Sequence, residues 1–154
     1  QRQMCIRDSA GSVSIPFLNM LTETAQELKA AGRRKAGILA TTGTVSTGLF
    51  QTALEACGLE SAVPGSYGQN LVMSLIYDEI KAGRPADPEK FEAVSRELQL
   101  SGCDSLILGC TELSLIKKNT PLGHGYLDAL EVLAKRCVQA CGAPLKTEYS
   151  VLFT

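Results

Sequence analysis

The stretch Asp104-Ser105-Leu106-Ile107-Leu108-Gly109-Cys110-Thr111-Glu112-Leu113 places polar and reactive side chains directly after an apolar run. A short apolar run between turn signals is typical of a strand buried in a parallel sheet. Residues that follow such a strand lie at its carboxyl end, where open α/β sheets bind their ligands. We therefore expect a strand at residues 105–109 and a functional site that begins at Cys110. The alternative is a buried, inert thiol, which is the commoner role of a cysteine.

The rest of the chain alternates strand and helix patterns around this stretch. Buried strands are expected at residues 36–40 and 60–63, and two further strands at residues 13–18 and 147–153, the former at a sheet edge because it contains a proline. Five helical apolar stripes begin at Met20, Leu49, Leu71, Phe91 and Leu127 and are each followed by a glycine, namely Gly32, Gly58, Gly83, Gly102 and Gly142. This alternation predicts an α/β fold: a parallel three- to four-stranded sheet with helices on both faces.

Composition excludes several classes of function. The chain has 154 residues, of which 45% are hydrophobic and 20% charged, and its net charge is −1. These are ordinary values for a globular protein with a core. Because there is no basic stripe, we expect no nucleic-acid partner. No apolar run reaches the length of a membrane span and no signal peptide is recognisable, so we expect no membrane partner and a cytoplasmic location.

The six cysteines are expected to be free thiols of a reducing compartment. Cys57, Cys137 and Cys141 fall on helical apolar stripes, where packing in the core explains them. There is no C-x-x-C pair and the only histidine is His124, so no metal site is expected. We expect His124 to lie in a surface loop, without an assigned role.

A second loop, Thr41-Thr42-Gly43-Thr44-Val45-Ser46-Thr47-Gly48, follows the strand at residues 36–40. Right-handed crossovers place it at the same sheet edge as Cys110. The loop leads into a helix, whose N–H groups and dipole favour an anion there. It lacks the Lys and Ser/Thr of a Walker A loop and does not match G-x-G-x-x-G. We interpret it as a cradle for a carboxylate; a helix N-cap with spare hydroxyls is the alternative.

The cradle changes the expectation for the thiol beside it. Helix N-termini and N–H donors favour the thiolate, which is the form that acts as base or nucleophile. We therefore expect Cys110 to favour the thiolate. Glu112 is a candidate to bind a cationic amine or to orient a proton donor, and its alternative role is that of a solvated loop carboxylate.

A family resemblance rests on four sequence blocks. In chain order they are Ile15-Pro16 with Glu23-Thr24-Ala25, Ala40-Thr41-Thr42-Gly43-Thr44, Gly109-Cys110-Thr111-Glu112-Leu113 and Leu127-Asp128-Ala129. With these blocks the chain resembles the aspartate/glutamate racemase family from about residue 13 to its end. The aspartate-racemase branch fits best, because glutamate racemases usually carry histidine where Glu112 stands.

The resemblance implies an isomerase that racemises an amino acid without PLP or any other cofactor. Family members have two similar α/β domains, and two cysteines in the cleft between them face opposite sides of the substrate α-carbon. One thiolate removes the α-proton and the opposite thiol returns a proton. The resemblance makes Cys110 the second catalytic cysteine and implies a homodimer for the full-length protein. It assigns the binding of a small amino-acid or dicarboxylate substrate to Thr41, Thr42, Gly43, Thr44, Thr111 and Glu112.

The chain departs from the family pattern at its start, where the usual Cys-Asn-Thr block of the first catalytic cysteine is absent. Residues 1–9 have no regular periodicity and are interpreted as a non-native leader. Residues 10–34 are expected to be a linker strand and helix from the missing first domain, 35–122 one racemase-type domain, and 123–154 a C-terminal helix and strand that return to the first domain. We therefore expect an N-terminally truncated racemase that is inactive alone.

Two other functions remain open at this point. One is a related enzyme of the same superfamily, such as a maleate isomerase or a hydantoin or glutamate racemase. The other is a non-catalytic domain that binds small acids, in which the cradle is kept while the acid–base pair is broken.

Overall fold

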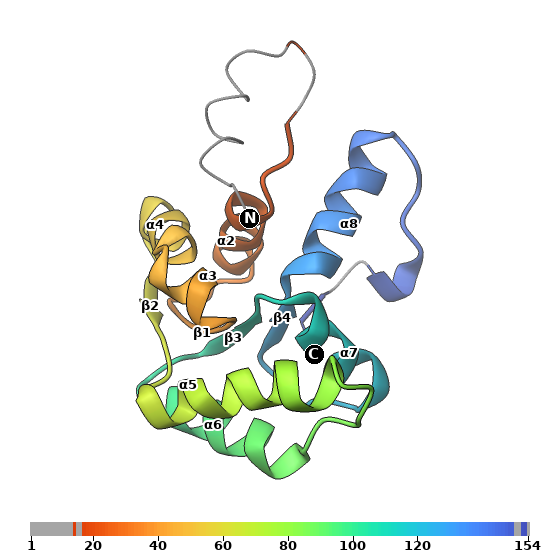
Figure 1. Cartoon of the computed structure of the whole chain (residues 1–154). Coiled ribbons are helices and arrows are strands. Elements are labelled where there is room, and N and C mark those ends of the chain that lie inside the picture. The colour runs from red at the N-terminus through yellow and green to blue at the C-terminus, as the bar shows by residue number, and fades with distance from the viewer. Residues whose placement is uncertain (1–13, 15–16, 150–151, 154) are drawn as a thin grey trace.

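Four strands form one parallel sheet in the computed structural model, which describes residues 14, 17–149 and 152–153 (Figure 1). The strand order is β2-β1-β3-β4, and all three neighbouring pairs are parallel. The strands are β1 (Lys35–Leu39), β2 (Glu60–Ala62), β3 (Ser105–Leu108) and β4 (Tyr126–Asp128). The α/β fold with a parallel sheet is thereby confirmed, at four strands.

The carboxyl ends of three strands lie level with one another. Leu39 of β1 is in register with Leu108 of β3, which is in register with Asp128 of β4. The segments that follow these strands therefore start side by side at one edge of the sheet, where ligands bind in this class of fold.

Helices cover both faces of the sheet, as the sequence predicts (Figure 1). Ile38 and Ile107 point to one face, and the neighbouring Leu39 and Leu108 point to the other, as the two-residue period of a strand requires. The first face packs against α2 (Met20–Ala30), α4 (Leu49–Ala56) and α8 (Ala129–Ala140). The second packs against α5 (Ser66–Met73), the π-helical η1 (Ser74–Ile80), α6 (Pro88–Leu100) and α7 (Thr111–Asn119).

Helix ends follow the expected signals in most places. All five predicted stop glycines have positive φ, the conformation that glycine adopts without a steric penalty. Asp87 caps α6 by accepting a hydrogen bond from the Glu89 amide at 2.9 Å, and Pro88 is the first helical residue. The helix expected from Leu71 begins earlier, at Ser66, and continues as the π-helical η1.

The structure differs from the sequence analysis at two places around the site. The segment after β1 is not a loop throughout, because Thr42–Ser46 form the short helix α3, which the Thr41 hydroxyl caps by accepting from the Thr44 amide at 3.3 Å. A helix that the sequence analysis did not expect, α7, begins directly after Cys110. Its apolar residues Leu113 and Ile116 are buried, which explains why the segment is helical.

The expected last helix starts two residues late. Tyr126–Asp128 form the edge strand β4, and Asp128 then caps α8 by accepting from the Leu130 amide at 2.8 Å. Cys137 and Cys141 are exposed, so their expected place in the core is wrong. The reason is that α8 buries only Ala129 and Val132.

The C-terminal strand expected at residues 147–153 is also wrong within the described part, where Thr147–Tyr149 form the 3-10 turn η2. Of the strand expected at residues 13–18, Phe17 and Leu18 are not in a strand, and most of the remainder lies outside the described residues, as does the leader at 1–9. The domain boundaries stay predictions; α2, β4 and α8 lie in the same layered unit as β1 and β3.

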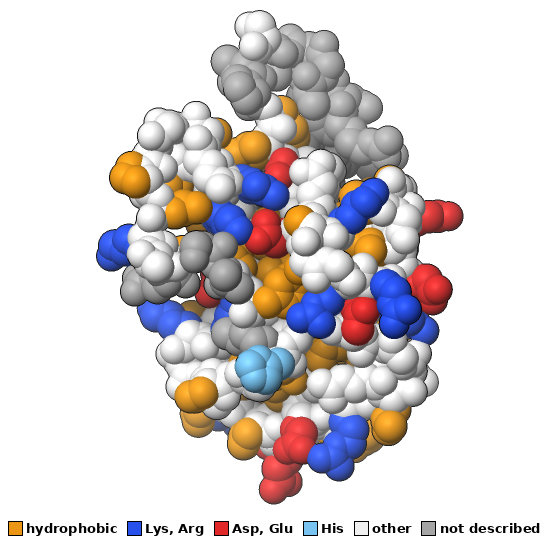
Figure 2. Space-filling model, turned by 180° about the vertical axis from the view of Figure 1, so that it is seen from behind, with side chains coloured by type: hydrophobic (Ala, Val, Ile, Leu, Met, Phe, Trp, Pro, Cys, Tyr) orange, Lys and Arg blue, Asp and Glu red, His pale blue; other side chains and the backbone are white. Residues whose placement is uncertain are grey.

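Two remaining observations concern the position of His124 and the length of the helices. His124, the pale blue side chain in Figure 2, is exposed as expected. None of the described helices is both long and apolar enough to cross a bilayer.

Candidate active site

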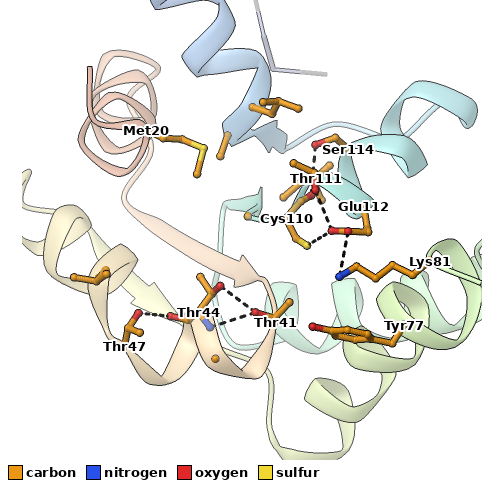
Figure 3. A pocket seen from close by; sticks show the side chains of 16 residues that line it. Met20, Thr41, Thr44, Thr47, Tyr77, Lys81, Cys110, Thr111, Glu112 and Ser114 are labelled. Carbon is orange, nitrogen blue, oxygen red and sulfur yellow. Dashed lines mark hydrogen bonds and ion pairs between the residues drawn. The ribbon is translucent and has the colours of Figure 1, made fainter. Parts of the chain in front are cut away.

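A pocket of about 470 Å³ opens at the carboxyl edge of the sheet (Figure 3). Its walls come from α3, the end of β3, the start of α7, η1 and the start of α8. The two loops that the sequence singled out therefore face one cavity. Of the predicted site residues, those that line it are Thr41, Gly43, Thr44, Cys110, Thr111 and Glu112.

Thr42 is the predicted site residue that does not line this pocket. Its amide donates to Met73 Sδ at 3.3 Å, and its hydroxyl accepts from Gln69 Nε2 at 3.3 Å. Gln69 Nε2 also donates to the Ala40 carbonyl at 2.9 Å. Thr42 therefore anchors the turn after β1 to α5.

The Cys110 thiol and the Glu112 carboxylate form the chemical centre of the pocket. Cys110 is the N-cap residue of α7, but its side chain makes no capping hydrogen bond. Instead Sγ donates to Glu112 Oε2 at 2.6 Å, and the Thr111 hydroxyl donates to the same oxygen at 3.1 Å. The short sequence spacing thus puts a proton donor and its acceptor on the first turn of one helix.

Burial and the neighbouring carboxylate fix the protonation state of this pair. Burial, followed by the hydrogen bond to Glu112, raises the pKa of Cys110 to about 11. The same hydrogen bond is the main cause that lowers the pKa of Glu112. The expectation that Cys110 favours the thiolate is therefore wrong. Lys81 lowers the thiol pKa, but burial and the carboxylate outweigh it.

Lys81 and Tyr77 are pocket residues that the sequence analysis missed. Lys81 Nζ lies 3.5 Å from Glu112 Oε1 and 4.4 Å from the centre of the Tyr77 ring. Tyr77 lies in η1, and Lys81 caps its C-terminal end. π-Helical turns are frequent at functional sites, but a sequence pattern does not distinguish them from α-helix. Figure 3 shows Lys81 pointing to Glu112, and Tyr77 lying beneath Lys81 with its hydroxyl directed toward Thr41.

Hydroxyl groups line the wall that α3 provides. Thr41 Oγ1 and Thr44 Oγ1 are 3.0 Å apart, and the Thr47 hydroxyl donates to the Thr44 carbonyl at 2.7 Å. A side chain built at Gly43 would meet no atom within 4 Å, so this wall is open. Because α3 has only five residues, its dipole is small, and hydroxyl groups are the main polar feature of this wall.

Two further observations limit the chemistry of the pocket. Among the described residues, Cys110 is the only cysteine that lines it. The part of the chain that the structure describes also holds no cluster of three or more His, Cys, Asp or Glu side chains that could bind a metal ion. The described lining residues thus supply one thiol, one carboxylate, one ammonium group and several hydroxyls.

Comparisons with known proteins point to one family. The family model for Asp/Glu/Hydantoin racemase matches residues 4–137. A Pectobacterium carotovorum subsp. carotovorum relative, described as an uncharacterized protein in the pnlA 3′ region, is 34% identical over 127 residues, which cover 80% of this chain and 83% of the relative. A glutamate racemase from Shewanella loihica is 27% identical over 130 residues, which cover 82% of this chain and 48% of that enzyme.

Solved structures agree with the sequence comparisons. The crystal structure of an aspartate racemase homologue from Pyrococcus horikoshii OT3 matches with a TM-score of 0.79 and 26% identity. The match covers 90% of this chain and 62% of that one. The chain thus spans most of the Pectobacterium relative but about half of the Shewanella enzyme and under two thirds of the Pyrococcus protein.

Proposed function

We propose, from the premise that this chain belongs to the Asp/Glu/Hydantoin racemase family, that it forms one half of an amino-acid racemase site in which Cys110 exchanges a proton with the substrate α-carbon. Membership of the family supports the proposal that the chain acts as a racemase-type isomerase. The observation that carries the proposal is the 2.6 Å contact between the protonated Cys110 thiol and Glu112, in a pocket with hydroxyl groups on another wall.

Cys110 acts in this proposal as the proton donor to one face of a substrate carbanion. Its S–H bond breaks, the electron pair on the α-carbon takes the proton to form the Cα–H bond, and a thiolate remains. In the opposite direction the thiolate removes the α-proton. Lys81, 3.5 Å from Glu112, offsets the negative charge that then builds up beside the carboxylate. A positioned acid or base of this kind contributes roughly 10²–10⁴-fold to a rate.

The opposite face of the substrate needs a second acid–base group. The family resemblance assigns it to another cysteine, whereas Cys110 is the only cysteine that lines the pocket within the described residues. With one such group, a proton returns to the face from which it left. We therefore expect this chain alone to exchange the α-proton of one enantiomer without inverting its configuration.

The charges and hydroxyls of the pocket favour a small acidic amino acid, with aspartate as the first candidate. Thr41 and Thr44 provide hydroxyl donors for the α-carboxylate, and Lys81 is the only Lys or Arg among the described lining residues. A cavity of about 470 Å³ leaves ample room for a substrate of this size. No cofactor is needed for a proton transfer between a thiol and carbon.

The test is the loss of the α-proton of aspartate or glutamate in D₂O, followed by proton NMR, with chiral chromatography of the same samples. We expect exchange with retained configuration, and its loss in Cys110→Ser. The matched control is Cys103→Ser, because Cys103 is buried beyond the opposite end of β3 and does not line the pocket. Exchange that persists in Cys110→Ser contradicts the role of this thiol, and interconversion of L- and D-aspartate by the chain alone contradicts the half-site.

The raised pKa of Cys110 favours one alternative, a domain that binds small acids without chemistry. A thiol with a pKa of about 11 is ionised to only about one part in a thousand at pH 8. Calorimetric binding of aspartate without any loss of its α-proton at high pH would support this function.

A further inference from the structure

A buried carboxylate next to the pocket makes a contact that its structural role does not require. Asp128 ends β4, is 2% exposed and caps α8 through the Leu130 amide at 2.8 Å. The same oxygen, Oδ1, also accepts from the Ser114 hydroxyl at 2.9 Å. Ser114 belongs to α7 and lines the pocket, so this second bond crosses from α8 to the helix that carries the thiol.

The crossing bond closes a ring around Cys110. The backbone leaves the sheet at Leu108, passes Cys110 and reaches Ser114 on the first turn of α7, where the Ser114 amide donates to the Cys110 carbonyl at 3.2 Å. The Ser114 hydroxyl then returns to Asp128, which is in register with Leu108 on the neighbouring strand. The turn that holds Cys110 is thus anchored to the sheet at both of its ends.

We propose that Asp128 is a positioning residue, which acts through the Ser114 hydroxyl to hold the Cys110 thiol against Glu112. This inference rests on the proposed function, because it assigns a means of keeping the proton donor in place. Cys110 is the extended N-cap residue and Glu112 is in the first helical turn, so fraying of that turn would change the contact between Sγ and Oε2. Burial of the Asp128 carboxylate is costly without partners, and Ser114 is one of the two donors that offset this cost.

A second tie between α7 and α8 offers an internal control. Lys117 Nζ lies 2.7 Å from Glu131 Oε2 and also donates to the Leu152 carbonyl at 2.9 Å, one helical turn beyond Ser114. Lys117 and Glu131 are also the charged groups that act on Asp128 from α7 and α8. If mere docking of the two helices set the state of the thiol, both ties would influence it. The proposal instead predicts that the Asp128–Ser114 hydrogen bond influences the thiol and that the Lys117–Glu131 pair does not.

The experiment is the rate of Cys110 alkylation by iodoacetamide across pH 7–11, resolved from the other cysteines by mass spectrometry of the Cys110 peptide. Ser114→Ala and Asp128→Ala are expected to free the thiol from Glu112, so that its apparent pKa falls and alkylation at pH 8 rises about threefold, equivalent to about half a pKa unit. Asp128→Asn is expected to keep the wild-type profile, because an amide oxygen accepts both hydrogen bonds. Lys117→Met is expected to keep it as well.

The possible results distinguish a failure of this inference from a failure of the proposed function. Glu112→Gln removes the carboxylate directly and must shift the Cys110 profile if the thiol–carboxylate pair exists; no shift would overturn the proposed function. If Glu112→Gln shifts the profile and Ser114→Ala leaves it unchanged, the positioning role of Asp128 alone is overturned. An equal shift in Lys117→Met also overturns it, because the effect would then be general docking. Ser114→Ala keeps the α8 cap intact and carries the test if Asp128→Ala does not fold, because the other contact of this hydroxyl, 3.5 Å from the Cys110 carbonyl, is too long to hold the turn.

Discussion

Two Glu–Lys pairs on the same face of the sheet, both involving the π-helical segment, differ in which parts of the chain their carboxylates join. Glu79 Oε1 lies 2.5 Å from Lys90 Nζ, and its other oxygen accepts from the Asp87 amide at 2.7 Å. Glu112 lies 3.5 Å from Lys81, and its other oxygen accepts from the thiol of Cys110. The lysine side chains are 45% exposed for Lys81 and 34% for Lys90, and the carboxylates are 19% exposed for Glu112 and 10% for Glu79.

The comparison indicates that a Glu–Lys pair can serve either stability or reactivity, depending on its surroundings. In the first pair the carboxylate bonds to groups 8 and 11 residues further along the chain, so it joins the π-helical segment to the start of α6. In the second pair the cation is loosely held at the pocket, and the carboxylate accepts hydrogen bonds from Cys110 and Thr111, which lie within two residues of it. We expect the Glu79 pair to control stability and the Glu112 pair to control reactivity.

The largest expected effect concerns stability at the Glu79 pair. Glu79→Ala removes an acceptor from the Asp87 amide and should lower the free energy of unfolding by about 2 kcal/mol, since hydrogen bonds to charged groups contribute roughly 1.5–3 kcal/mol each. Urea denaturation measures this effect. Glu112→Ala is the matched variant and should change stability by less than about 1 kcal/mol. Equal losses of unfolding free energy in Glu79→Ala and Glu112→Ala would contradict this distinction between the two pairs.

The next effect concerns thiol reactivity at the Glu112 pair. Glu112→Gln removes the charged acceptor of the Cys110 proton, so the pKa of Cys110 should fall from about 11 toward its ordinary range. Each unit of this fall raises the thiolate fraction at pH 8 about tenfold, and the rate of Cys110 alkylation reports it. Glu79→Gln should leave that rate unchanged. A rate that responds to Glu79 instead would contradict the assignment.

A smaller effect is expected at the exposed cation. Lys81 lowers the pKa of Cys110, so Lys81→Met should raise that pKa further and slow alkylation at pH 8, by about threefold at most because solvent screens an exposed charge. The same variant should bind aspartate more weakly in calorimetry while the urea midpoint stays constant. Unchanged binding of aspartate would remove Lys81 from the acid-binding role.

The smallest effect is the pH dependence of stability that the thiol contributes. The folded-state pKa of Cys110 lies above its ordinary value of 9.0, at about 11, so the folded state binds the proton more tightly. The stabilisation is therefore complete below pH 9 and is lost as the pH rises from about 9 to 11. Partial exposure of the thiol keeps the effect small. Thermal unfolding should show a slightly steeper fall in this window for the wild type than for Cys110→Ser; identical slopes would contradict the raised pKa.

The sequence predicted the parts of the fold that rest on local pattern. The runs at residues 36–40, 60–63 and 105–109 lie within one residue of β1, β2 and β3. For β1 and β3 the reason is that a strand buried on both faces must be apolar, whereas β2 is an edge strand that is not buried. The strand β4 was missed, since three residues that run directly into a helix carry no stop signal. The helix α7 was missed because only two of its residues are buried and no glycine ends it.

In the candidate site, too, the residues that follow a buried strand were predicted, and those that folding brings in from elsewhere were not. Cys110, Glu112 and Thr44 were predicted because each follows a buried strand, and chain direction alone brings such segments together. Lys81 reaches the pocket from η1, which lies on a different part of the chain, so no local pattern indicates it. The protonation state of Cys110 depends on burial and on the exact placement of a carboxylate, and neither is encoded in residue spacing.

The most direct test of the central claim is the rate at which this chain exchanges the α-proton of aspartate for deuterium as the pH rises from 7 to 11. If the Cys110 thiolate is the base, the rate should rise about tenfold per pH unit and level off near pH 11, and Cys110→Ser should abolish it. A rate that does not depend on pH, or one that Cys110→Ser retains, would contradict the claim.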